Sequence, residues 1–151
     1  MFEAHNLRQL FPEGSFGPPS SEVQIVDAER ALGHKLPPLL DELYRSFDGF
    51  TGPTGAQFLY SLLVTPGVMS TSLVVHTRFL RSENYLPPFL QRVVALGDTG
   101  VGPCWLMEID HPRRLLWWDA EWGDDYEVVS CGLLDAWVRA KEHYHSLSGR
   151  T

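Results

Sequence analysis

The chain has 151 residues, 44% of them hydrophobic and 12% aromatic, which predicts one compact soluble domain with a substantial core. Its formal net charge is −7 and its isoelectric point is near 5.2. This charge argues against a nucleic-acid-binding surface, because phosphate binding draws most of its affinity from Lys and Arg. A basic partner fits the charge better.

The N-terminal stretch MFEAHNLRQLF has no charged-then-apolar leader, and no apolar run approaches the roughly 18–20 residues of a membrane-spanning helix. We therefore expect a cytoplasmic domain that does not bind a membrane. Cys104 and Cys131 form neither a disulfide framework nor a zinc motif. We expect both to be small buried hydrophobic residues.

Residues 1–20 are expected to be an N-terminal extension and linker. Phe2, Leu7, Leu10 and Phe11 suit one or two helical turns, and the Pro/Gly/Ser-rich stretch PEGSFGPPS that follows disfavours regular structure. A single domain is then expected over residues 21–147.

The opening of that domain predicts two short helices. Ser21 and Gln24 have the spacing of a capping box, and Gly33 suits the left-handed position that ends a helix, so the first helix covers residues 22–32. A second helix begins at the two prolines after Leu36, which suit a first turn, and ends at Asp48-Gly49. The apolar positions expected to be buried are Ile25, Ala28 and Leu32 in the first helix, and Leu36, Leu40, Leu43, Tyr44 and Phe47 in the second.

The middle of the chain has weaker patterns. The run FTGPTG at residues 50–55 predicts a loop, and AQFLYSLLV at residues 56–64 has the composition of a strand. Val75, Phe79 and Leu80 have helical spacing, which indicates a helix over about residues 70–82 followed by a loop.

From Val93 onward, four strand-like stretches separated by turn sequences predict an antiparallel meander. They are VVALG, CWLMEID, LLWWDA and YEVVS. A last helical stripe should place Leu134, Trp137 and Val138 on that sheet. The predicted fold class is therefore α+β, with N-terminal and C-terminal helices flanking a mainly antiparallel sheet.

These residues resemble the signature of the SUKH superfamily, the Smi/Knr cell-wall-regulator homology domain. Its opening pattern matches Glu29, Leu32-Gly33, Leu36-Pro37, the Leu40 to Phe47 face and Asp48-Gly49. Later parts of the pattern match Val93 to Gly97, Gly100, Gly102, Ile109-Asp110, Trp117-Trp118, and Ser130 with Leu133, Leu134 and Trp137. Pro103 departs from the acidic or amide residue that such domains often carry after the second glycine.

The resemblance implies a SUKH-like fold and a protein that binds proteins rather than an enzyme. Bacterial SUKH-like proteins mostly look like immunity proteins that neutralise a cognate toxin, and the acidic charge suits a basic nuclease toxin. Two alternatives stay open. One is a regulatory scaffold related to the fungal cell-wall-synthesis regulator, and the other is an uncharacterised enzyme.

We find no convincing catalytic, cofactor or metal motif. The run GDTGVG at residues 97–102 leads into a strand rather than a helix, so it predicts a hairpin turn and not a phosphate loop. His143 and His145 are two apart, which points them in different directions on a helix, while His76 and His111 have no motif partner. Nothing places a base beside Cys104.

One turn concentrates acidic and aromatic residues. Between Asp119 and Glu127 the chain has five carboxylates and no Lys or Arg, beside three tryptophans. The stretch lacks the alternation of a calcium loop and the context of a glycosidase pair. A solvated turn and a partner-binding site remain equally open. The candidate partner-binding residues are Asp119, Glu121, Trp122, Asp124, Asp125 and Glu127.

Overall fold

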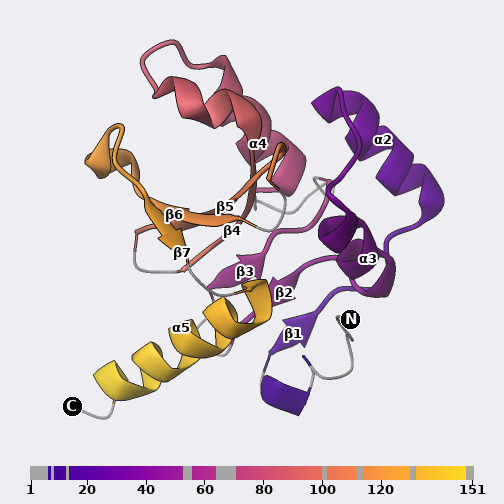
Figure 1. Cartoon of the computed structure of the whole chain (residues 1–151). Coiled ribbons are helices and arrows are strands. Elements are labelled where there is room, and N and C mark those ends of the chain that lie inside the picture. The colour runs from indigo at the N-terminus through magenta and orange to yellow at the C-terminus, as the bar shows by residue number, and fades with distance from the viewer. Residues whose placement is uncertain are drawn as a thin grey trace.

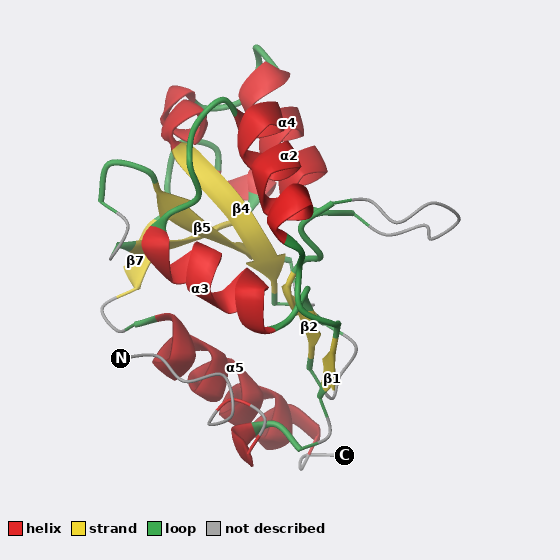
Figure 2. Ribbon diagram, turned by 90° about the vertical axis from the view of Figure 1, so that its right-hand side faces the viewer, coloured by secondary structure: helices red, strands yellow, loops and turns green. Residues whose placement is uncertain are grey.

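The structure is a computed structural model, and it confirms the α+β class: helices pack around antiparallel sheets (Figures 1 and 2). It describes residues 7, 9–12, 14–52, 56–63, 71–99, 102–111, 114–129 and 132–148, with side chains after residue 140 described only at residue 142. In chain order the elements are β1 (Ser15–Phe16), α2 (Glu22–Leu32), α3 (Pro38–Ser46), β2 (Phe50–Thr51), β3 (Gln57–Leu59), α4 (Leu73–Ser82), the 3-10 helix η1 (Pro88–Arg92), β4 (Val93–Asp98), β5 (Cys104–Glu108), β6 (Leu115–Trp118), the 3-10 helix η2 (Ala120–Trp122), β7 (Glu127–Val129) and α5 (Leu133–Ser148).

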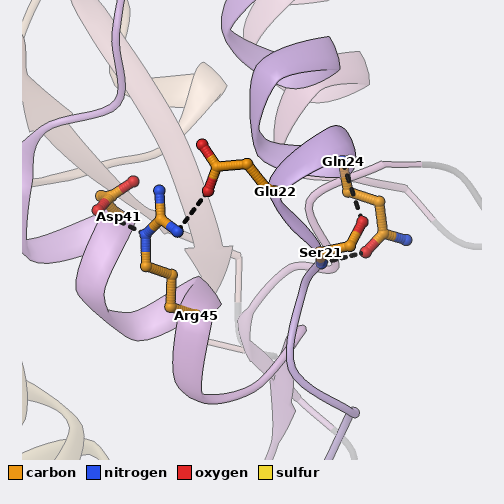
Figure 3. Close-up of polar contacts among 5 residues, drawn as sticks. All are labelled: Ser21, Glu22, Gln24, Asp41 and Arg45. Atoms are coloured by element: carbon orange, nitrogen blue, oxygen red, sulfur yellow. Dashed lines mark hydrogen bonds and ion pairs between the residues drawn. The ribbon is translucent and has the colours of Figure 1, made fainter.

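Helix α2 begins and ends as the sequence predicts. The Gln24 backbone N–H donates to the Ser21 hydroxyl at 3.2 Å, and the Ser21 N–H donates to the Gln24 side chain at 2.8 Å (Figure 3). This reciprocal pair satisfies two backbone donors that the first turn leaves free. At the other end Gly33 has φ 84°, a conformation that a β-branched residue resists.

The two helices are joined by side-chain contacts. Arg45 of α3 donates to Glu22 of α2 at 2.6 Å and to Asp41 in its own helix at 3.0 Å (Figure 3). In the connecting segment, the Leu36 N–H donates to the Glu29 carboxylate at 2.8 Å. Glu29 therefore holds the start of α3 against α2, which gives this acidic residue a structural role.

The predicted apolar positions of both helices are buried. Leu40, Leu43, Tyr44 and Phe47 have no measurable exposure, and Ile25 and Ala28 are at most 1% exposed. The Asp48-Gly49 corner follows at once. Asp48 accepts a 2.8 Å hydrogen bond from the Leu62 N–H, and Gly49 has φ 91°. The corner thus ties α3 to the segment after β3.

The segments predicted as linker and loop contain strands. Strand β1 lies inside PEGSFGPPS and β2 inside FTGPTG, and they pair antiparallel with each other. The predictions of no regular structure there are wrong for residues 15–16 and 50–51, because aromatic packing outweighs local composition. Phe16 stacks on Phe50 at 4.7 Å, and Phe11 contacts Phe50 edge-on at 4.9 Å.

Strand β3 is shorter than predicted. A strand was expected over residues 56–64, and within the described residues 56–63 only Gln57–Leu59 forms one. Strand β3 pairs antiparallel with β2 and completes a three-stranded sheet in the order β1-β2-β3. This sheet approaches β4, where the Tyr60 N–H donates to the Leu96 carbonyl at 2.8 Å. Gly97 permits this approach, since a Cβ there would lie 1.9 Å from the Phe58 carbonyl oxygen.

The predicted meander is confirmed, with strand order β4-β5-β6-β7 and every pair antiparallel. One face of this sheet packs on α4 and η1 around residues such as Leu80, Leu90 and Leu106. The opposite face, which includes Leu96, Trp105 and Leu115, belongs to the larger core. Strands β4, β5 and β6 are therefore covered on both faces, whereas β7 is largely exposed.

Helix α4 confirms over residues 73–82 the helix predicted for about residues 70–82, and the structure shows which of its sides is buried. Val75 and Phe79 are each 47% exposed, whereas Leu73, Val74, Thr77 and Leu80 are buried. The two apolar residues therefore mark the solvent side. The segment after α4, predicted as a loop, contains η1.

Helix α5 lies on the opposite side of the molecule from α4 (Figure 1). Its Trp137 is fully buried and contacts Phe50 at 5.4 Å and Phe58 at 6.4 Å. Helix α5 therefore packs partly on the three-stranded sheet (β1-β2-β3), whereas the sequence predicted packing on the four-stranded meander. No helix in the described parts of the chain is long and apolar enough to span a membrane.

Candidate functional site

The candidate partner-binding residues lie in the connection between β6 and β7, which we call the acidic turn (Asp119–Glu127). It forms the orange loop beyond these two strands in Figure 1. Asp119 is the N-cap of η2, and its carboxylate accepts a 3.0 Å hydrogen bond from the Glu121 N–H. Gly123 reverses the chain with φ 63°, and its carbonyl accepts a 2.9 Å bond from the Trp118 indole. The turn therefore has a defined shape held by its own residues.

A row of tryptophans runs from the core to this turn. Trp105 is 4% exposed and stacks on Trp117 with ring centroids 6.3 Å apart and planes 23° apart. Trp117 in turn meets Trp122 edge-on at 6.0 Å and 87°. Trp122 is 36% exposed, so the outermost ring of the row is accessible to a partner while it packs against Trp117.

The carboxylates around Trp122 face solvent. Glu121, Asp124, Asp125 and Glu127 are exposed and Asp119 is half-buried. Among the described residues none of the five forms an ion pair, although other acidic residues such as Asp41 and Asp110 do. Residues 119–129 contain no Lys or Arg, so all the charged side chains of this stretch are negative.

This arrangement suits contact with a large partner better than coordination of an ion. In the described parts of the chain, no three His, Cys, Asp or Glu side chains are close enough together to hold a metal ion. The carboxylates spread over an exposed bend with an aromatic ring among them. Exposed Trp surrounded by charge is typical of a protein-binding surface.

The cysteine weighed as a nucleophile is a core residue. Cys104 is 7% exposed and packs in the cluster beneath α4 and η1. Burial raises the pKa of its thiol to about 12, and the Asp98 and Asp119 carboxylates act in the same direction. The thiol is therefore protonated at neutral pH and is a poor nucleophile. Cys131 and the side chains of His143 and His145 lie outside the described residues.

Sequence reasoning missed a polar network around Tyr60. Its hydroxyl lies 3.2 Å from Nδ1 of His76, and Asp98 is hydrogen-bonded to it. Burial lowers the pKa of His76, which favours a neutral imidazole. His76 lies 16 residues after Tyr60, and Asp98 lies 22 residues after His76, so no short sequence motif could have revealed the network.

The GDTGVG run connects antiparallel neighbours, as predicted. Asp98 of β4 pairs with Cys104 of β5, and the Thr99 hydroxyl and N–H both donate to the Pro103 carbonyl. Residues 100 and 101 are outside the described part. The run closes a hairpin and does not precede a helix N-terminus, so it lacks the geometry that holds phosphate.

Fold and surface together define an α+β domain with an acidic, aromatic turn at the end of its four-stranded sheet. The chain matches no family model and no curated protein.

Proposed function

We propose that this domain is a non-enzymatic binding protein that uses the acidic turn to engage a basic protein partner. We further propose that the partner is a toxin domain and that the chain is a bacterial immunity protein, as its resemblance to the SUKH superfamily implies. The observation that carries the proposal is Trp122, 36% exposed at the end of a tryptophan row and surrounded by carboxylates without ion-pair partners among the described residues.

A rigid exposed Trp is suited to anchoring a partner. The ring already packs edge-on against Trp117, and this contact reduces the conformational freedom that binding would remove. Truncation of such an anchor commonly costs about 2 kcal/mol or more of binding free energy. Trp122 should therefore contribute mainly to the lifetime of the complex.

The carboxylates have a different role. They are exposed, so each is screened by solvent and adds little to affinity. Together with the net charge of −7 they attract a basic partner over about a Debye length and orient it before contact. Such steering speeds association with a basic partner.

The decisive experiment is a protection assay. The chain is used as bait in its source cells, and the C-terminal module of a captured multidomain protein is then expressed alone and together with the chain. Growth arrest by the module alone, relieved by co-expression, would support the immunity function. Capture of wall-synthesis enzymes without a toxic module would favour the regulatory scaffold instead.

The binding face is tested with two variants and the identified partner. Trp122→Ala should mainly raise the off-rate, whereas Asp124→Asn combined with Asp125→Asn should slow association, most visibly at low salt. Surface plasmon resonance at several salt concentrations separates these effects. Wild-type kinetics for both folded variants would place the binding face elsewhere.

The matched controls are substitutions of the same kinds at exposed positions outside the acidic turn. Tyr85 is 77% exposed, so Tyr85→Ala removes an exposed aromatic ring at another position. Asp27→Asn with Glu42→Gln removes two exposed charges from α2 and α3. Both controls should retain wild-type association and dissociation rates at physiological salt.

A further inference from the structure

Strand β7 ends the four-stranded sheet. It pairs with β6 on one side, and within the described residues no strand pairs with its other side. Backbone groups of an antiparallel strand point alternately toward and away from a given neighbour. Some N–H and C=O groups of Glu127–Val129 must therefore face away from β6, where an added strand could bind them.

The side chains of β7 present different chemistry on the two faces of the sheet. Glu127 is opposite Trp117 in the register, so it shares the face on which Trp117 contacts Trp122. Val128 is opposite Leu116, on the other face, and is 49% exposed. An added strand would thus meet a carboxylate on one face and an apolar side chain on the other.

Charge identifies the kind of strand that fits. A second copy of this chain would bring its own acidic turn against the first, placing carboxylates of like charge together. A segment with Lys or Arg at alternate positions would instead place its cations beside Glu127 and Trp122, where carboxylates and an indole ring both attract them. Apolar residues between those cations would lie next to Val128.

We infer that β7 binds an extended, basic segment of the partner protein by strand addition, with basic residues on the Trp122 face and apolar residues on the Val128 face. The inference rests on the proposed binding function and specifies how the partner binds. Because β7 has only three residues, the added backbone bonds are few. The neighbouring Trp122 and carboxylates must supply much of the affinity.

The probe is a blocked seven-residue peptide, Lys-Val-Lys-Val-Lys-Val-Lys. Its matched control has the same sequence with N-methyl groups on the three central residues, which removes backbone donors on both edges but retains charge and side chains. Binding to the full chain is followed by NMR, with amide hydrogen exchange at Glu127, Val128 and Val129. We expect the N-methylated peptide to bind about tenfold more weakly, the loss expected for one or two backbone hydrogen bonds.

Exchange of at least one outward-facing amide of β7 should slow about tenfold with the unmodified peptide only. Val128→Pro should abolish this binding, and Val128→Thr, which keeps a strand-forming residue and its N–H, should retain it. Equal binding of both peptides, or shift changes centred away from β7, would overturn strand addition. If strand addition fails but the chain still protects cells from a toxin, the proposed immunity function stands. If the peptide binds at β7 but no toxin partner exists, the immunity function is rejected and strand addition stands.

Discussion

Gly97 should be among the least replaceable residues of the fold. It lies where β4 passes β3, and a Cβ there would sit 1.9 Å from the Phe58 carbonyl oxygen, 2.5 Å from the Phe58 carbonyl carbon and 2.8 Å from the Gln57 carbonyl oxygen. All three neighbours are backbone atoms, so no side-chain rotation can relieve the clash. Gly97→Ala must therefore move one strand away from the other.

The expected cost follows from that geometry. Overpacking a well-packed core usually costs about 1–3 kcal/mol, and a clash with backbone should reach the upper end of that range. Separation of the strands would also weaken the Tyr60–Leu96 hydrogen bond, which contributes about 0.5–1.5 kcal/mol. We expect Gly97→Ala to lower the free energy of unfolding by about 3 kcal/mol or more.

The matched control is Gly52→Ala. Gly52 is also buried and also beside Phe58, but a Cβ there would meet only ring carbons at 3.4–3.6 Å, an ordinary contact. This variant should stay within about 1 kcal/mol of wild type, since the lost flexibility of the unfolded chain partly offsets any crowding. Urea unfolding followed by circular dichroism measures both. Equal midpoints for Gly97→Ala and wild type would refute the close approach of β3 and β4.

Three further outcomes concern the core and the buried titratable groups. Leu43→Ala should cost about 2–5 kcal/mol in urea unfolding while the folded fraction keeps wild-type partner affinity, because Leu43 is fully buried in α3. Cys104 should react with iodoacetamide at pH 8 far more slowly than a free cysteine, and Cys104→Ser should still protect cells; loss of protection by a folded variant would revive the enzyme hypothesis. Because burial lowers the pKa of His76, its contribution to stability should be complete above about pH 6.5 and decline as the pH falls below that value. His76→Gln should flatten this part of the stability profile, and an unchanged slope would contradict the role given to His76.

The helix pair was predictable because its signals are local. The capping box at Ser21 and the left-handed Gly33 act within a few residues, and the apolar spacing of α3 needs only one buried side. The meander was predictable for a similar reason, since turn sequences separate its strands. The helices α2 and α3 and the strands β4 to β7 begin and end within one or two residues of the predicted bounds.

The short strands could not be predicted from their own residues. β1 and β2 have two residues each and lie in Gly- and Pro-rich sequence, so they become strands through pairing in the order β1-β2-β3 and through aromatic packing of Phe16 on Phe50. The buried side of α4 could not be predicted either. The spacing of its apolar residues predicts a helix, but which side is buried depends on where the sheet lies.

For the candidate site, the sequence determined the charge and the aromatic content of the acidic turn, because these are properties of consecutive residues. Tertiary structure decided the rest. Strand register placed Trp105 beside Trp117 and left β7 at the edge, and the turn then brought Trp122 against Trp117. These contacts join separate strands, and the free energy that selects them comes from packing across the sheet rather than from any local preference of the chain.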